Sequence, residues 1–554
     1  MTPHRDDSGS AHETSRRSYL GSVSGLVATV GLAGATSDHS LESPEASAVS
    51  RPWQGISVSD SGESVSGDLA HLDIGSSLAA TRVGDHQVRI DLDTDEPYPD
   101  IIDVHTDLGV EPEEDDLWKA IYDHYQSFSP TDRNHMYVVP RGTWLVETDD
   151  IHLEAHELFG LRGNPWATLR VNDQDVDRMM TVGTIDDSLP HAQRTVLQDL
   201  EIDIRGDMDT GIGRWYTHRF GLIERVIMRG SRNRLHDDYG GDRHTIMVDG
   251  VKPTTTNLIR GCHLNNWDVS HDAPQVGHAI AYSSEPNHEG LNIWEGCQVT
   301  GYTDNGFYMS TSSGRNLIQG CTAVNCAGAA IRIGENDVVR NCHIYMREAP
   351  AHPWSGIWLE NGGGQVVEKV YIENRIAKPT EIIRCTHDGH ARFTDVHVED
   401  AGTDGRVIRV NDDDETKTIF NSCTFHGRTT PERSDYAVYV QSSNVRFQDC
   451  SFDFASETES DRHAIFVTGR GSDVDRFSLD HCIIDADGAT LRFGDDGKRH
   501  RVEQSEFGAL VMSDADVTLE EVLWIGNHHD GRTIFHGDRI NWQGDFNWGF
   551  DVTA

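Results

Sequence analysis

Beyond residue 240 the chain holds ten short segments that read apolar, X, apolar. In an extended strand the middle side chain points away from its two neighbours, so X faces outward if the neighbours are buried. Most of the X residues are arginines or aromatics. In chain order they are Met247, Ala281, Tyr308, Arg332, Trp358, Arg384, Arg409, Tyr439, Phe466 and Arg492. Aromatic faces stack on sugar rings, and guanidinium groups bind carboxylate or sulfate as a fork.

This row therefore predicts a surface that binds a glycan chain. We expect Tyr308, Trp358, Arg384 and Arg409 to bind substrate, with Trp354 as a wall beside them. A structural explanation also fits, because strands favour aromatic residues and an arginine stacked on a ring stabilises a fold by a cation–π interaction.

Acid–base candidates lie near the middle of this row. Glu360 is two residues beyond Trp358 and so shares its face, Asp304 precedes the Tyr308 segment, and the segment 347–355 carries His352. Glycoside hydrolysis uses two carboxylates, and elimination from a uronate uses a base beside a charge-neutralising arginine or cation. We therefore predict a catalytic group of Glu360, Arg332, His352 and Asp304. In so acidic a chain, each of these carboxylates is also explained as ordinary surface.

Further acidic and histidine residues flank the same row. They are Glu285, His288, Glu289, Glu335 and Asp337. A separate cluster stands at 236–244, where Asp237, Asp238 and Asp242 could hold a Ca²⁺ ion through their carboxylates. The predicted chemistry requires no cofactor, and Ca²⁺ is the one candidate ion.

A recurring unit positions these residues. The segments LIRGCHL, IWEGCQV, LIQGCTAV and VVRNCHIY place a cysteine between two short apolar runs, and TIFNSCTF, VRFQDCSF and FSLDHCII repeat the pattern downstream. Several neighbouring units are 21 to 27 residues apart. A period of this length, built from short β-type runs, indicates a β-solenoid. Each coil reads strand, turn, strand, two-residue corner, strand and loop, which predicts a parallel β-helix with coils about 4.8 Å apart.

The cysteine follows the corner and points inward in this interpretation. Val and Leu occupy the same position in other units, which favours a buried ladder of free thiols. Disulfides along the ladder remain an alternative, although the nine cysteines are an odd number and aligned side chains one coil apart point the same way.

The start of the solenoid resembles a known family. The stretch from Pro112 to Ser127 begins with acidic residues and continues with an amphipathic pattern, which predicts a short helix. The segment Pro140-Arg141-Gly142-Thr143-Trp144 follows. This order resembles the pectate-lyase-like family, in which a helix caps the solenoid and a PxGTY segment begins the first coil; here Trp replaces Tyr. The resemblance implies an all-β, single-stranded right-handed parallel β-helix with an N-terminal capping helix. It also implies a substrate groove along the sheet that carries the Arg–aromatic row.

The N-terminus predicts export. Ser15-Arg16-Arg17-Ser18-Tyr19-Leu20 resembles the twin-arginine motif, and a short apolar run and Ala33-Gly34-Ala35 follow. The run is too short to span a bilayer stably. We therefore expect no transmembrane segment in the mature protein and an extracellular or cell-surface location. The predicted organisation is a signal peptide at 1–35, an acidic Ser/Gly-rich linker at 36–96, the cap and first coil at 97–175, the β-helix at 176–540 and a tail at 541–554.

The chain has a formal net charge of −44 and only 6 of its 47 basic residues are lysine. This composition resembles that of exported proteins from salt-loving archaea. Its negative field argues against nucleic acid and anionic membranes as partners. The sequence predicts a polysaccharide hydrolase or lyase. The alternative is a non-catalytic surface or adhesion protein that binds glycans, and a viral tail-spike-like binder is a third hypothesis. The sequence identifies neither the sugar nor the oligomeric state.

Overall fold

The computed structural model describes residues 71–73, 78–84, 87–92 and 99–534. The last range has gaps at 174, 186–191, 209, 233–243, 266–279, 349–354, 377–380, 388, 403–404, 412–416, 428–435, 455–462, 470–473, 509, 515–516, 518, 521 and 530–532. Residues 1–98 and 99–554 form two compact units. In the first unit, the strands β1 (His71–Asp73), β2 (Leu78–Gly84) and β3 (Gln87–Leu92) form an antiparallel sheet.

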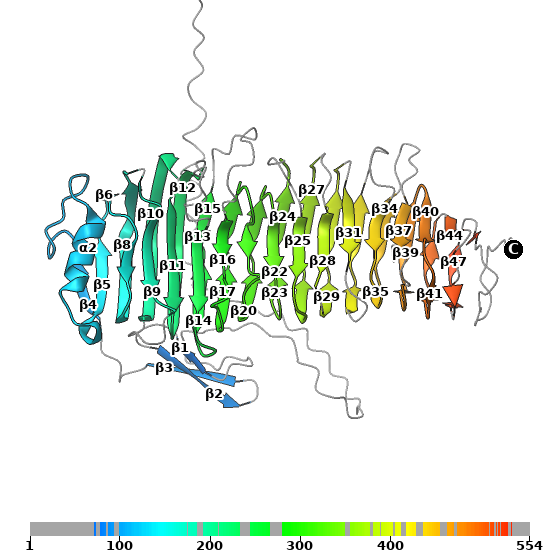
Figure 1. The fold of residues 1–554 in the computed structure, drawn as a ribbon, viewed down its shortest axis with the longest axis horizontal. Helices are drawn as coiled ribbons and strands as arrows, with labels where there is room; N and C mark the ends of the chain where they lie inside the picture. Colours follow the sequence, from blue (N-terminus) through cyan, green and yellow to red (C-terminus); the bar gives the residue numbers. More distant parts are fainter. Residues whose placement is uncertain are drawn as a thin grey trace, which may run out of the picture. The chain divides into compact units, whose positions relative to one another are not determined.

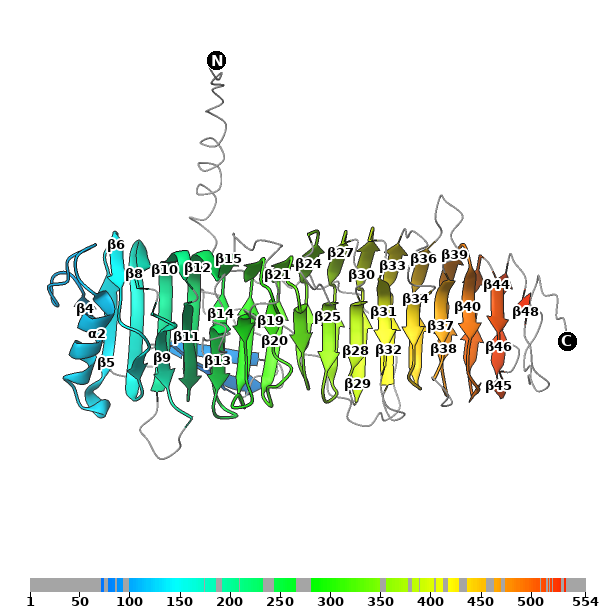
Figure 2. The ribbon, with the colours of Figure 1, turned by 45° about the horizontal axis from the view of Figure 1, so that its top comes forward.

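The second unit is a stack of coils whose strands form two long parallel sheets (Figures 1 and 2). Sheet 1 takes one strand from each coil. Its strands are β7 (Ile151–Leu153), β9 (Arg178–Gly183), β11 (Gly211–Thr217), β13 (His244–Gly250), β16 (Ile280–Ser283), β19 (Phe307–Tyr308), β22 (Ala329–Ile333), β25 (Ser355–Glu360), β28 (Glu381–Thr386), β31 (Arg406–Val410), β34 (Tyr436–Val440), β37 (His463–Val467), β40 (Ala489–Phe493), β44 (Leu510–Ser513) and β48 (Thr533–Ile534).

Sheet 2 takes two strands from most coils, one on each side of the corner. Its strands are β4 (Asp100–Asp103), β5 (Asn134–Val139), β6 (Thr143–Val146), β8 (His156–Val171), β10 (Ala192–Met208), β12 (Phe220–Arg232), β14 (Thr256–Arg260), β15 (His263–Asn265), β17 (Leu291–Glu295), β18 (Gln298–Thr300), β20 (Arg315–Gln319), β21 (Thr322–Val324), β23 (Val338–Arg340), β24 (His343–Met346), β26 (Gln365–Glu368), β27 (Tyr371–Asn374), β29 (His390–Thr394), β30 (His397–Asp400), β32 (Lys417–Asn421), β33 (Thr424–Gly427), β35 (Val445–Gln448), β36 (Ser451–Phe454), β38 (Ser478–Asp480), β39 (Ile483–Ala486), β42 (Arg501–Glu503), β43 (Glu506–Phe507), β46 (Leu523–Ile525) and β47 (His528–His529). The short strands β41 (Gly497–Lys498) and β45 (Leu519–Glu520) pair in parallel as a separate two-stranded sheet.

The corner between paired strands of sheet 2 has a fixed geometry. Its first residue takes a left-handed conformation, for example Asn341 at φ 53° and Gly296 at φ 59°. Glycine and asparagine adopt this conformation at little cost, so they suit the position. The second corner residue turns its side chain into the core, as the repeat predicted. In successive coils it is Leu200, Val226, Cys262, Cys297, Cys321, Cys342, Val370, Val396, Cys423, Cys450, Cys482 and Ser505, all buried.

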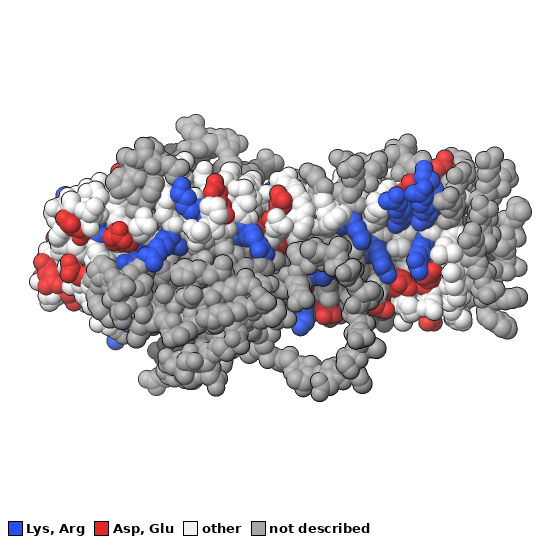
Figure 3. Space-filling view, turned by 90° about the horizontal axis from the view of Figure 1, so that it is seen from below, with Lys and Arg blue, Asp and Glu red and all other residues white. Residues whose placement is uncertain are grey.

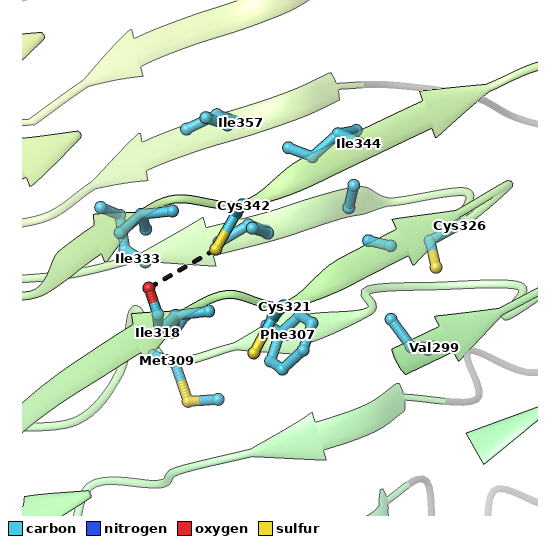
Figure 4. Packing of buried hydrophobic residues seen from close by; sticks show 14 of the residues in the cluster. Val299, Phe307, Met309, Ile318, Cys321, Cys326, Ile333, Cys342, Ile344 and Ile357 are labelled. Atoms are coloured by element: carbon cyan, nitrogen blue, oxygen red, sulfur yellow. Dashed lines mark hydrogen bonds between the residues drawn. The ribbon is translucent and has the colours of Figure 1, made fainter. Parts of the chain in front are cut away.

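The cysteines of the corners stack inside the solenoid (Figure 4). All nine cysteines of the chain are free thiols and all are buried, which confirms the prediction of reduced, interior side chains. The Cys342 thiol donates to the Ile318 carbonyl of the preceding coil at 3.5 Å and to the Arg340 carbonyl at 3.3 Å. The cysteine side chain therefore fills the space inside the corner, and its thiol also donates hydrogen bonds to backbone carbonyl groups.

One α-helix, α2 (Leu117–Gln126), precedes the first coils within the described residues. It is shorter than the predicted span because residues 112–115 form turns. Asp116 caps its N-terminus by accepting a hydrogen bond from the Trp118 amide at 3.1 Å. Leu117, Trp118, Ile121 and Tyr125 are buried in the same core as the coils, and the helix contacts β6 and β7 at the N-terminal end of the stack (Figure 1).

Candidate functional site

The outward residues of sheet 1 form a continuous row, here called the Arg–aromatic row. Cα pairing between strands aligns Tyr308 with Arg332, and each later member with the next. The members of this row, from β16 to β40, are Ser283, Tyr308, Arg332, Trp358, Arg384, Arg409, Tyr439, Phe466 and Arg492. The alternation of the strands therefore predicted most of the row correctly.

The prediction for β16 was wrong by two residues. Met247 pairs with Ser283, which in turn pairs with Tyr308, so Ser283 and not Ala281 belongs to the row. Ala281 is fully buried in the core. A shift of two residues keeps the same face of a strand, so the error is one of register between coils. The apolar–X–apolar pattern ends at Tyr282, because Ser284 follows Ser283. Met247 also lies in the row but is almost fully buried.

Four side chains of the row stack along the solenoid axis. The Arg332 guanidinium lies between two rings, with Cζ 4.9 Å from the Tyr308 centroid and 3.8 Å from the Trp358 centroid. On the other side of Trp358, Arg384 Cζ lies 4.0 Å from the same ring. Trp358 Nε1 donates to Thr386 Oγ1 at 2.8 Å, which fixes the indole. These side chains are half-buried, so they present edges and guanidinium groups to solvent.

Arg332 and Glu360 form a forked ion pair. Arg332 Nε and Nη2 donate to the two carboxylate oxygens of Glu360 at 2.8 and 2.6 Å, and Ser310 Oγ donates to Glu360 Oε2 at 2.8 Å. Gly334 lies on the coil between those of Ser310 and Glu360, and a Cβ there would lie 2.8 Å from the Ser310 carbonyl oxygen, so the backbones approach closely at this point. Both oxygens of Glu360 are thus engaged, which favours a role in holding Arg332 over a role in proton transfer.

Arginines outnumber carboxylates in the next coils. Arg409 Nη1 donates to Glu381 Oε1 at 2.6 Å, and Arg406 Nη1 lies 3.7 Å from the same oxygen. Arg384 Nε lies 3.6 Å from Glu381 Oε2, beyond hydrogen-bond distance, and neither it nor Arg409 Nε has a hydrogen-bond acceptor within the described part of the chain. Burial, with the positive charges of Arg409 and Arg332, lowers the pKa of Arg384.

This group contrasts with the acidic chain that carries it. The space-filling view shows one face, on which basic side chains gather in groups bordered by acidic ones and are most concentrated towards the C-terminal coils (Figure 3). The chain as a whole has a net charge of −44. Around Arg384, four arginines face two glutamates, so this part of the surface carries a positive excess suited to an anion.

The remaining predicted residues divide into two sets. His352, Trp354, Asp237, Asp238 and Asp242 lie outside the described residues. Asp304 lies in the turn before β19, where its carboxylate accepts a hydrogen bond from Asn305 Nδ2 at 2.7 Å and borders Gly328. Of the predicted catalytic group, the structure therefore brings Arg332 and Glu360 together. Among the residues that the structure describes, no group of three or more His, Cys, Asp or Glu is placed to hold a metal ion.

A carboxyl pair lies at the N-terminal end of the row and joins Glu285, a flanking residue that the sequence predicted, to Asp249, which the sequence interpretation missed. Asp249 is the penultimate residue of β13, and its Oδ1 accepts a hydrogen bond from the Glu285 amide of the next coil at 2.8 Å. Asp249 is fully buried, and its Oδ2 has no hydrogen-bond partner within the described residues. Burial raises the pKa of Asp249 to about 8, and the charge of Glu285 acts in the same direction. The two-residue step from Trp358 to Glu360, applied to Met247, would have found Asp249.

Two other flanking candidates serve the fold. Asp337 is buried and accepts hydrogen bonds from the amides of Asn316 and Gly334 at 2.7 and 2.9 Å. His288 is fully buried; its Nδ1 accepts from the Gly250 amide at 2.9 Å and its Nε2 lies 3.1 Å from the Arg315 carbonyl. Such complete internal bonding assigns both to the turns between coils.

Comparison with known proteins identifies the architecture. Residues 240–377 match a family described as "Right handed beta helix region". The fold is a right-handed parallel β-helix. This confirms the predicted fold class and handedness, as does the near-absence of helix from the described coils. No curated protein matches the chain. No helix among the described residues is long and apolar enough to cross a membrane.

Several solved structures are similar to this β-helix. One is the catalytic domain of a GH87 alpha-1,3-glucanase in complex with tetrasaccharides, with 11% identity, TM-score 0.36, and coverage of 73% of this chain and 69% of that chain. A PL6 alginate lyase in complex with a trisaccharide has 10% identity and a TM-score of 0.34, and the match covers 80% of this chain and 86% of that chain. The Streptococcus pneumoniae surface protein and adhesin PfbA has 11% identity and a TM-score of 0.27, and the match covers 82% of this chain and 100% of that chain. At this identity the likeness concerns the fold alone.

Proposed function

We propose that this protein binds an acidic polysaccharide along the Arg–aromatic row and cleaves it, by hydrolysis or by elimination. The stack of Tyr308, Arg332, Trp358 and Arg384 carries the proposal. It alternates rings with guanidinium groups along the solenoid axis, so an extended glycan laid on sheet 1 meets one such side chain at each coil, about every 4.8 Å. Aromatic surface and forked cationic donors are what sugar rings bearing carboxylate or sulfate require.

Each member of the row has a proposed part. Trp358 and Tyr308 contact sugar rings, while Arg384 and Arg409, whose side chains are partly exposed, bind carboxylate or sulfate. Arg332, held by Glu360, neutralises charge on the bound sugar. His352 and Asp304 stay candidates for the catalytic group, Trp354 stays a candidate for substrate binding, and Ca²⁺ at Asp237, Asp238 and Asp242 stays a candidate ion. We also propose export by the twin-arginine route, supported by the Arg16-Arg17 motif and the acidic composition.

A non-catalytic glycan-binding protein is the second candidate. The observation that favours it is the engagement of both Glu360 oxygens by Arg332 and Ser310, which leaves this carboxylate poorly suited to move a proton. In that case the same surface would serve adhesion.

One experiment separates the candidates. The purified protein is incubated with neutral, uronate-containing and sulfated polysaccharides in molar salt, which screens the repulsion between the acidic chain and an anionic glycan. New reducing ends indicate hydrolysis, and absorbance of an unsaturated uronate indicates elimination. Binding without either product supports the non-catalytic candidate. Equal affinity for neutral and acidic glycans would contradict the proposed role of the arginines.

A further inference from the structure

Asp249 and Glu285 occupy equivalent positions on adjacent coils. Pairing of Met247 with Ser283 places these carboxyl groups two residues further along the same outward face, and the Asp249–Glu285 amide hydrogen bond holds them together. The negative charge of Glu285 raises the pKa of Asp249, which disfavours ionisation of both carboxyl groups together.

Their surroundings differ sharply. Asp249 is fully buried, with Oδ2 unpartnered among the described residues, whereas the Glu285 side chain is 21% exposed. Glu285 Oε1 lies 3.5 Å from His244 Nε2, and its Oε2 accepts from Thr311 Oγ1 at 3.3 Å. These contacts are longer than those of the Arg332 fork on Glu360. The two environments favour a neutral form of Asp249 beside the more exposed carboxyl group of Glu285, and carboxyl pairs in such different surroundings are the usual acid–base groups of enzymes.

The pair also borders the glycan row. Ser283, two residues before Glu285, pairs with Tyr308, and the charges of Glu285 and Glu360 both act on the pKa of Tyr308, which burial raises. Tyr308 thus lies between the carboxyl pair and the Arg332–Glu360 pair. A sugar stacked at Tyr308 would lie next to Glu285.

We propose that Glu285 is the proton-accepting catalytic residue of this protein and that the buried Asp249, which accepts the hydrogen bond of the Glu285 amide, is a positioning residue. This inference rests on the proposed cleavage of an acidic polysaccharide. In hydrolysis, Glu285 takes a proton from water as the water oxygen bonds to the anomeric carbon. The glycosidic C–O bond breaks and its oxygen takes a proton from solvent. In elimination, Glu285 takes the proton from the carbon beside the sugar carboxylate. The C–H electron pair becomes the new double bond, and the C–O bond on the next carbon breaks with protonation from solvent.

Other charged groups face the pair. Arg214 and Tyr216 of β11 lie on one side, His244 precedes on β13, and Tyr308 of β19 lies on the other. Burial is the main cause that raises the pKa of Asp249, and the positive charge of Arg214 lowers that pKa. Ionisation of Asp249 therefore comes in the weakly alkaline range, where it would repel an anionic sugar.

The test compares Glu285→Gln, Asp249→Asn and the control Glu289→Gln. Glu289 is exposed and lies in the same turn, so the control removes an equivalent charge outside the pair. We expect Glu285→Gln to lower kcat at least about 100-fold while glycan affinity changes less than about twofold, and Glu289→Gln to match the parent. The KM of the parent should rise above about pH 8. Asp249→Asn, which stays neutral, should lack this rise.

A second readout needs no substrate. Asp337, whose pKa burial raises to about 7, contributes equally to the spectra of the parent and of Asp249→Asn. The infrared difference between these two proteins should therefore show a protonated carboxyl group at pH 7 that is lost as the pH rises through about 8. Its absence, unchanged turnover in Glu285→Gln, or glycan binding with no cleavage by the parent would overturn the inference. If Trp358→Ala leaves binding intact while Glu285→Gln abolishes cleavage, the proposed groove fails and the catalytic assignment stands.

Discussion

Replacement of Trp358 by alanine removes the ring on which the Arg–aromatic row is built. Arg332 and Arg384 each lose a cation–π partner, at 3.8 and 4.0 Å, and Thr386 loses the indole donor. Partly exposed cation–π contacts contribute about 0.5–1 kcal/mol each, and a hydrogen bond about 0.5–1.5 kcal/mol. The variant should therefore lose about 2–3 kcal/mol of unfolding free energy. The flanking residues Ile357 and Leu359 stay buried in the core, so the coil itself should persist.

The effect on glycan binding should be of similar size. Stacking on an aromatic side chain contributes about 1–3 kcal/mol, taking nucleic-acid bases as the analogue. Since each 1.4 kcal/mol is tenfold in Kd, affinity should fall roughly 5- to 150-fold. Isothermal titration calorimetry with the polysaccharide that the parent binds measures this directly. Chemical denaturation, followed by circular dichroism, measures the loss of stability separately.

Tyr371 provides a matched control. It is half-buried on the outer face of sheet 2, stacks on His397 with centroids 5.5 Å apart, and donates to Glu399 Oε2 at 2.8 Å. Tyr371→Ala should lower stability but leave glycan affinity at the parent value. If Trp358→Ala binds the glycan within twofold of the parent, or if both variants weaken binding equally, the glycan does not lie on the Arg–aromatic row.

Three further predictions concern the row and the coils that carry it. Arg384→Gln should weaken binding of uronate-containing or sulfated glycans about 10- to 150-fold in parallel titrations and leave neutral glycans unaffected, because a charge-assisted contact is worth about 1.5–3 kcal/mol. An equal loss for neutral glycans would contradict the anion-binding role. Gly334→Ala should destabilise the protein by about 1–3 kcal/mol in urea unfolding, because the new Cβ meets the Ser310 backbone at 2.8 Å; unchanged stability would show that the coil can yield. Burial lowers the pKa of His288, His387 and His500 to about 4, below the unfolded value of about 6.5. The free energy of unfolding should therefore fall as the pH drops from about 6.5 towards 4, by about 1.4 kcal/mol per histidine and pH unit. A melting temperature that stays constant over this range would refute that assignment.

The sequence by itself determined the coil. A two-residue corner followed by an inward position recurs through the chain, and this pattern alone places the stacked Cys262, Cys297, Cys321 and Cys342 inside the solenoid. Because strand side chains alternate with a period of two, the same units also predict the outward residues from Tyr308 to Arg492. These features depend on local chain geometry, which neighbouring residues fix.

The tertiary structure decided how outward residues pair between coils. The register of β16 against its neighbouring coils is not visible in its own residues, so the pattern predicts Ala281 where Ser283 lies. The fork between Arg332 and Glu360 depends on the register between coils, which pairs Arg332 with Trp358. In the sequence Asp249 resembles any other carboxylate of an acidic surface, and only its complete burial beside Glu285 distinguishes it. Burial and charge pairing depend on residues a full coil apart that the stacking of coils brings together, and no local pattern records which of them will meet.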